Sequence, residues 1–337
     1  MAPSEESASK QLDFETHLEL KQTAPDVFTN AHEPWVFHVT HTYPGPLMMA
    51  QAAAAAWKTV PDGFMLDSLQ THFMLAPSPA KPLKYHVQRI GNGRRFAVRI
   101  VNISQDDKIC VTITTSFVND AAPWSGRAMT HAVPMRIDRR RREITLDDFE
   151  FGRTERGPFM KFERLPHVHQ GWLVPFQQAR AKEIYYDTHM LFLSPFSAPK
   201  SPATTIAPTL AQIAPAISSP RGTAAHVLAV VHVSDYHVMD CPLSIHGIAH
   251  GSWAIGDQSK TPIPSAMKIM TSLNHTIHFH THNGFRADEV MYIEVTSPWA
   301  KDGRAMINSR IFSKQGMLIA TVVQEAFYVF KDAGAKL

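Results

Sequence analysis

One acidic side chain, Asp235, stands out because of the apolar residues that surround it in the sequence. It lies within residues 222–240, and no Asp, Glu, Lys or Arg occurs between Gly222 and Ser234. Burying a carboxylate in such surroundings costs folding free energy unless it is paired or hydrogen-bonded, so an isolated one is a candidate for a catalytic role. Because burial disfavours the charged form, we expect Asp235 to have a raised pKa, as suits a general base near neutral pH.

Four histidines, His275, His278, His280 and His282, form the most metal-like cluster. Alternate residues of a strand face the same side, so His278, His280 and His282 could approach a Zn or Fe ion together. No matching carboxylate ligand is evident. We therefore interpret the cluster as a histidine-rich strand end and expect no bound metal.

The segment 222–240 has the composition of a helix that is buried on most of its surface, because a solvated helix would show a polar face. A second such helix is predicted at 47–57, where an Ala-rich run follows Tyr43-Pro44-Gly45-Pro46. Four strand-like runs bounded by turn residues follow each helix. The runs are 67–75, 83–90, 95–104 and 108–118 in the first half, and 267–280, 289–297, 304–313 and 317–330 in the second.

The second half of the chain repeats the first. Ser68-Leu69-Gln70 matches Ser272-Leu273-Asn274, and residues 104–117 match residues 313–327 with one residue inserted. A repeat of this length predicts two copies of one structural unit, with an interface between them where a site can form. A sheet curled around one central helix satisfies the pattern of each copy, so we predict an α+β fold.

The predicted organisation has a disordered N-terminus at 1–12, a first unit at 13–120, a linker at 121–180 and a second unit at 181–333. Residues 194–220 are rich in Pro, Ala, Ser and Thr, and we predict an insertion or long loop there within the second unit.

Composition excludes several classes of protein. Hydrophobic residues make up 44% and charged residues 19%, which indicates a soluble globular protein. The formal net charge of +3 gives no reason to expect nucleic acid, and no apolar run reaches the roughly 20 residues of a membrane span. Cys110 and Cys241 are too few for a disulfide framework, which favours a reducing compartment.

The final residues, Ala335-Lys336-Leu337, are a close variant of the Ser-Lys-Leu peroxisomal address. We therefore expect the protein in the peroxisomal matrix, with the peroxisomal import receptor as a partner.

An ordered set of motifs resembles the type II acyl-CoA thioesterases, a family with bacterial TesB-like and eukaryotic peroxisomal members. The motifs are 45–52, 68–77, 91–96 and Ser116-Phe117 in the first half, and Val233-Ser234-Asp235, His246-Gly247-Ile248, Leu273-Asn274-His275, Phe279-His280 and Val323-Gln324-Glu325 in the second. The resemblance covers residues 14–120 and 222–330. It implies the double-hotdog fold, in which two tandem hotdog units each wrap an antiparallel sheet around a central helix. One departure is Gly45-Pro46, where the family has a Gly-Gly pair.

The resemblance also implies an activity and a site. The activity is hydrolysis of acyl-CoA to a free carboxylic acid and coenzyme A, with the thioester as substrate and no cofactor or metal. The family's catalytic residues fall on Asp235, Ser272 and Gln324. Asp235 would activate water, while Ser272 and Gln324 would position the water or the thioester carbonyl.

Three further expectations follow. Gln51 would hold, in the first helix, the place of Asp235 in the second, with Ser68 and Thr115 as silent counterparts, so each chain would have one working site. The four consecutive arginines at 139–142 are interpreted as solvated linker, with contact to coenzyme A phosphates as the alternative. Members of this family commonly pair through exposed sheet faces, so we also expect a homo-oligomer.

Other functions stay open at this point. The same fold also hydrates or dehydrates enoyl-CoA thioesters, usually with a His–Asp pair, and fold alone does not fix function. A non-catalytic acyl-CoA-binding accessory protein of a biosynthetic pathway is a third possibility. A serine-nucleophile hydrolase would need Gly-x-Ser-x-Gly at a strand-to-helix turn, and this motif is absent from the chain.

Overall fold

The structure is a computed structural model that describes most of the two predicted units. The described residues are 14–33, 35–37, 42–120, 126–136, 150–154, 157–161, 168–178, 184–193, 201–213, 216–217, 222–236, 238–248 and 266–331. The predicted disordered segment at 1–12, the arginines at 139–142 and the tripeptide Ala335-Lys336-Leu337 lie outside these ranges.

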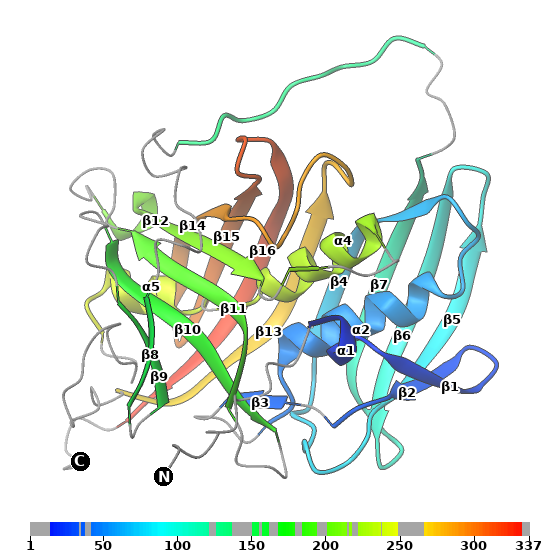
Figure 1. The fold of residues 1–337 in the computed structure, drawn as a ribbon, viewed down its shortest axis with the longest axis horizontal. Coiled ribbons are helices and arrows are strands. Elements are labelled where there is room, and N and C mark those ends of the chain that lie inside the picture. The colour runs from blue at the N-terminus through cyan, green and yellow to red at the C-terminus, as the bar shows by residue number, and fades with distance from the viewer. Residues whose placement is uncertain are drawn as a thin grey trace, which may run out of the picture.

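Within the described residues, fourteen strands form one large antiparallel sheet (Figure 1). Its strand order is β1-β2-β5-β6-β7-β4-β13-β16-β15-β14-β12-β11-β10-β3. The strands before residue 120 are β1 (Leu20–Ala24), β2 (Val27–Asn30), β3 (Trp35–Phe37), β4 (Phe64–Phe73), β5 (Lys84–Asn92), β6 (Phe96–Gln105) and β7 (Lys108–Asn119). Those after it are β10 (Val168–Gln178), β11 (Ile184–Leu193), β12 (Ile206–Ile213), β13 (Met267–Phe279), β14 (Met291–Lys301), β15 (Arg304–Phe312) and β16 (Leu318–Phe330), while β8 (Glu150–Thr154) and β9 (Gly157–Lys161) pair separately.

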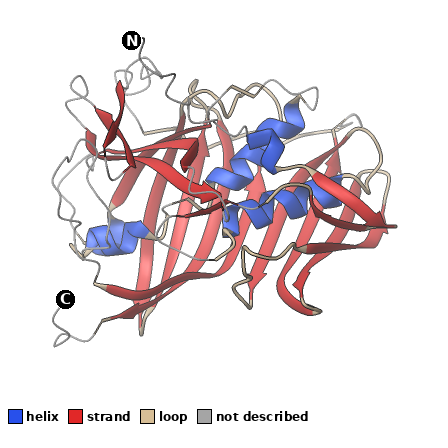
Figure 2. Cartoon of the chain, turned by 60° about the horizontal axis from the view of Figure 1, so that its bottom comes forward, coloured by secondary structure: helices blue, strands red, loops and turns tan. Residues whose placement is uncertain are grey.

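Two apolar helices, α2 (Gly45–Trp57) and α4 (Thr223–Val233), pack against each other on the same side of this sheet (Figure 2). Small side chains such as Ala52 and Ala229 are fully buried in these helices. The other helices within the described ranges are the short α1 (Phe14–His17), η2 (Pro202–Thr204) and α5 (Asp240–Ile245). None of the helices in the described ranges is long and apolar enough to cross a membrane.

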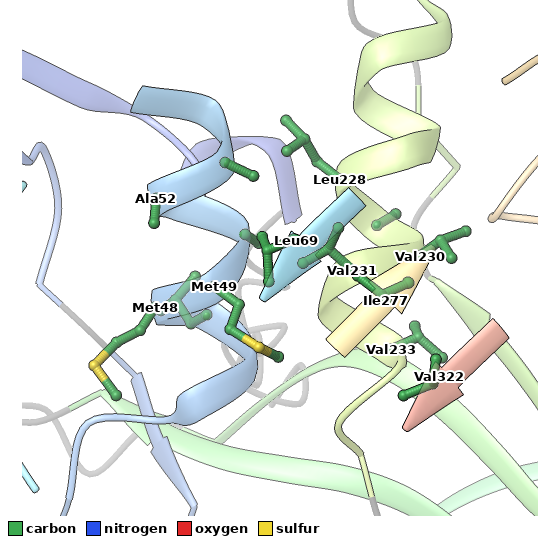
Figure 3. Close-up of a cluster of buried hydrophobic side chains, with 14 of the residues drawn as sticks. Met48, Met49, Ala52, Leu69, Leu228, Val230, Val231, Val233, Ile277 and Val322 are labelled. Carbon is green, nitrogen blue, oxygen red and sulfur yellow. The ribbon is translucent and has the colours of Figure 1, made fainter. Parts of the chain in front are cut away.

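The two units join where β4 of the first pairs with β13 of the second. In this register Leu69 lies opposite Ile277, and Ile277 lies opposite Val322 of β16. All three side chains are buried and lie beneath the two helices (Figure 3). The core is therefore continuous across the junction, and it brings residues distant in sequence to adjacent strands.

The predicted helix at 222–240 is shorter than expected, because α4 ends at Val233 and Ser234 is its C-cap. The Ser234 hydroxyl donates to the Val231 carbonyl at 2.7 Å, which satisfies one of the carbonyls left free in the last turn. Asp235 consequently lies in the turn after the helix rather than within it. Ahead of β1, Phe14–His17 form the helical turn α1.

Strands occur in two stretches where the sequence pattern predicts linker or loop. Within 121–180, β8 and β9 pair with each other, and β10 joins the large sheet between β11 and β3. Within 194–220, β12 inserts between β11 and β14, with Pro208 opposite Glu294. In β12, pairing with β11 and β14 outweighs the weak strand propensity of Pro and Ala.

Candidate active site

The structure brings Asp235, Ser272 and Gln324 together in one hydrogen-bond network. Gln324 Nε2 donates to Asp235 Oδ1 at 2.6 Å and to Ser272 Oγ at 2.8 Å. Ser272 Oγ donates to Asp235 Oδ1 at 3.3 Å. The exposed fractions are 6% for Asp235, 9% for Ser272 and 0% for Gln324, so the network is screened from bulk water.

A bulge in β13 sets the direction of the Ser272 side chain. Ser272 lies opposite Ala326, and His275 lies opposite Gln324, so one extra residue of β13 is accommodated between them. This bulge allows Ser272 and His275, three positions apart, both to face the buried side of the sheet. Strict alternation along the strand would have turned one of them outward.

The carboxyl group of Asp235 has an altered acidity. Burial raises the pKa of Asp235 from 3.8 to about 7, while the hydrogen bonds from Gln324 and Ser272 act in the opposite direction. The carboxylate therefore exchanges a proton close to neutral pH, which is the property required of a general base. Sequence reasoning predicted this direction from the apolar neighbours of Asp235.

The other oxygen of Asp235, Oδ2, faces the first turn of α2. A Cβ atom built on Gly45 would lie 2.9 Å from Asp235 Oδ2 and 3.3 Å from the ring of Phe73. Only glycine fits this approach without a shift of the surroundings, and Pro46 next to it has no N–H to donate. The positive end of the α2 dipole thus lies beside the carboxylate. The first unit contributes to the site through Gly45, and sequence reasoning assigned no such role to this glycine.

Gln51 does not match Asp235 in position, although it is equally buried. It lies in the middle of α2, whereas Asp235 follows the end of α4. Gln51 Oε1 accepts hydrogen bonds from the hydroxyls of Tyr43 and Tyr85, and its Nε2 donates to the His17 carbonyl at 2.7 Å. Both ends of this carboxamide are engaged within the protein, which indicates a structural role.

The histidines of the predicted cluster do not converge. His275 is fully buried on the inner side of the sheet, whereas His278 is exposed. Both ring nitrogens of His282 are engaged, with Nδ1 2.9 Å from Asp120 Oδ2 and Nε2 2.8 Å from the Leu66 carbonyl. No group of three His, Cys, Asp or Glu side chains within the described ranges is placed to hold a metal ion.

Two family models match the chain. Residues 32–118 match the N-terminal domain of acyl-CoA thioesterases, and residues 161–328 match their C-terminal domain. Acyl-coenzyme A thioesterase 8 of Mus musculus is 26% identical over 321 residues, which cover 91% of this chain and 86% of that protein. Peroxisomal acyl-coenzyme A thioester hydrolase 1 of Saccharomyces cerevisiae is 32% identical over 108 residues, or 32% of this chain and 31% of that protein.

A solved structure shows the same fold. The crystal structure of acyl-CoA thioesterase II TesB2 from Mycobacterium marinum superposes with a TM-score of 0.63 at 18% identity, covering 96% of this chain and 99% of that one. The predicted double-hotdog fold and the resemblance to type II acyl-CoA thioesterases are thereby confirmed. The chain belongs to the acyl-CoA thioesterase family and is a thioester hydrolase of double-hotdog fold.

Proposed function

We propose that Asp235 is the general base of acyl-CoA hydrolysis and that Ser272 and Gln324 hold it in place. The supporting observation is that the Ser272 hydroxyl and the Gln324 carboxamide both donate hydrogen bonds to Asp235 Oδ1. Because both donors bind Oδ1, Oδ2 is the oxygen that takes a proton from water. Burial keeps the pKa of this carboxyl at about 7, so the base is available near neutral pH.

The reaction proceeds in two balanced steps. Asp235 removes a proton from water, and the resulting hydroxide attacks the thioester carbonyl carbon to give a tetrahedral oxyanion. The oxyanion collapses, the carbon–sulfur bond breaks, and the proton on Asp235 passes to the departing coenzyme A thiolate. The N-terminus of α2, which begins at Gly45 beside Oδ2, supplies a positive potential for the developing negative charge. A carboxylate, a hydroxyl and a carboxamide account for these steps without a covalent enzyme intermediate or a cofactor.

The geometry favours hydrolysis over enoyl-CoA hydration. Hydration on this fold usually needs a His–Asp pair, whereas the groups that donate to Asp235 are a hydroxyl and a carboxamide. His282 does pair with Asp120 through Nδ1, but its Nε2 lies 2.8 Å from the Leu66 carbonyl at the junction of the two units. Both ring nitrogens of this histidine are therefore already engaged within the protein.

A thiol-release assay tests the proposal. The wild-type protein is screened against short, medium, long and branched acyl-CoAs, and enoyl-CoA absorbance is followed in parallel. We expect free coenzyme A with at least one chain class, and Asp235→Asn should lower kcat by about 1,000-fold or more with the fold intact. Thiol release at the wild-type rate by Asp235→Asn would remove Asp235 from the mechanism, and loss of enoyl absorbance without thiol release would indicate a hydratase.

We further propose that the protein acts in peroxisomes. Two observations support this: the sequence Ala335-Lys336-Leu337 is close to the Ser-Lys-Leu address, and the yeast relative is named a peroxisomal thioester hydrolase. A fluorescent protein fused to the N-terminus should colocalise with a peroxisomal marker. Removal of the last three residues should make the signal diffuse, and unchanged peroxisomal fluorescence would contradict a role for the tripeptide.

A further inference from the structure

A buried polar row crosses the junction of the two units directly beside the proposed site. It consists of Thr71 on β4, His275 on β13 and Gln324 on β16, which lie opposite one another in register. Their exposed fractions are 1%, 0% and 0%. The next row that faces the same side of the sheet consists of Leu69, Ile277 and Val322. It is wholly apolar and lies beneath the helices (Figure 3).

Each side chain of the polar row has one buried polar atom without a hydrogen-bond partner in the described part of the chain. These atoms are Thr71 Oγ1, His275 Nδ1 and Gln324 Oε1. A buried polar group that lacks a partner is destabilising, and native proteins leave few of them. Thr71 and Gln324 flank His275, each with its Cβ about 5 Å from that of His275, so a small group placed over His275 lies within side-chain reach of both neighbours.

The protonation state of His275 follows from its neighbours. The Ser234 hydroxyl donates to the Val231 carbonyl at 2.7 Å, so its oxygen accepts from His275 Nε2 at 3.1 Å. Burial lowers the pKa of His275 to about 4, so the ring is neutral near pH 7. With the proton on Nε2, Nδ1 carries a lone pair and can only accept a hydrogen bond.

The other two atoms complete the set. Gln324 uses its Nε2 to donate to Asp235 and Ser272, so its Oε1 is an acceptor. The Thr71 hydroxyl has a proton to donate. Two acceptors and one donor are the complement of one water molecule, and a buried water typically makes about three such hydrogen bonds.

We infer that Thr71, His275 and Gln324 bind one buried water molecule, and that this water fixes the orientation of the Gln324 carboxamide. The water donates to His275 Nδ1 and Gln324 Oε1 and accepts from Thr71. With Oε1 held on that side, Nε2 is directed at Asp235 Oδ1, whereas a flipped carboxamide would place an oxygen against the carboxylate. Thr71 and His275 are thus positioning residues that act through Gln324. The bound water is distinct from the attacking water, because its partners lie in a row with almost no exposure.

A crystal structure tests the water site directly. At a resolution near 1.8 Å, we expect one spherical density peak within about 3.2 Å of Thr71 Oγ1, His275 Nδ1 and Gln324 Oε1. A row without density there, or with the three side chains bonded to one another, would overturn the inference. This measurement does not depend on the proposed catalytic function.

The positioning role, which rests on the proposed function, is tested with Thr71→Val. This substitution removes the hydroxyl at nearly constant volume, and we expect kcat for thiol release to fall about 5- to 10-fold with KM within about twofold. The acid limb of the kcat/KM profile should also move to higher pH, because a less ordered Gln324 stabilises ionised Asp235 less well. Thr71→Ser should restore both values.

A matched control separates positioning from stability. Thr209 on β12 is also buried, with an exposed fraction of 2%, and lies outside the site, so Thr209→Val should leave kcat and the pH profile unchanged even if Tm falls. An unchanged kcat and pH profile for Thr71→Val would overturn the positioning role. If instead Asp235→Asn retained thiol release, the proposed function would fail while the water site could still be observed in the crystal.

Discussion

Replacing Asp235 by Asn tests the electrostatics of the site through protein stability as well as through catalysis. The pKa of Asp235 is 3.8 in an ordinary environment and about 7 in the folded protein. Between these values the unfolded chain has lost its proton while the folded protein retains it. The folded state therefore binds more protons, and the free energy of unfolding falls as pH rises from about 4 to about 7.

The magnitude follows from the same shift. Raising this pKa from 3.8 to about 7 corresponds to about 4 kcal/mol of folding free energy that is lost once the pH exceeds 7. The carboxamide of Asn carries no charge and avoids this loss, and its oxygen can still accept from Gln324. We therefore expect Asp235→Asn to gain about 3 kcal/mol relative to wild type between pH 5 and pH 8.

The assay is urea denaturation of wild type and variant at pH 5, 6, 7 and 8. Using the difference between the two proteins removes the contribution of every other titrating group. Asp107→Asn is a suitable control, because it makes the same chemical change at a side chain that is 97% exposed. A difference that stays constant for Asp235→Asn, or that favours wild type at pH 8, would refute a raised pKa at Asp235.

Three further predictions concern Gln324, Gly45 and Ser68. The hydrogen bond from Gln324 lowers the pKa of Asp235, so Gln324→Met should move the acid limb of the kcat/KM profile upward by about one pH unit. Gly45→Ala should lower kcat by about 10-fold or more because its Cβ would lie 2.9 Å from Oδ2, whereas Gly91→Ala, which meets no atom within 4 Å, should leave kcat unchanged. If Ser68 is a silent counterpart of Ser272, Ser68→Ala should leave thiol release within about twofold of wild type. A large loss in that variant would mean that the first unit contributes a second site.

The repeated order of one apolar helix and four strands could be predicted from sequence, because side-chain periodicity is a local property. The four strands of the first unit were predicted at 67–75, 83–90, 95–104 and 108–118, and β4 to β7 lie within a few residues of these ranges. The direction of the Asp235 pKa shift was also predicted, from the apolar residues that precede it in sequence, although the groups found at its carboxyl are Ser272, Gln324 and Gly45.

Pairing between distant strands could not be predicted in the same way. Strand β12 is recognised only through its partners, because the Pro and Ala residues in and around it give it a loop-like composition. The choice of Ser272 and Gln324 came from resemblance to a family, since Ser and Gln are common in strands and carry no local signal.

The sequence by itself determined that an isolated acid lies among apolar residues in the second of two similar units. Only the tertiary structure decided what surrounds that acid. The β4–β13 pairing, the bulge after Ser272 and the first turn of α2 at Gly45 together place its partners. The physical reason is that the side-chain pattern of a strand specifies which of its faces is buried but not which strand lies beside it. The position of Ser272 and Gln324 beside Asp235 depends on that pairing.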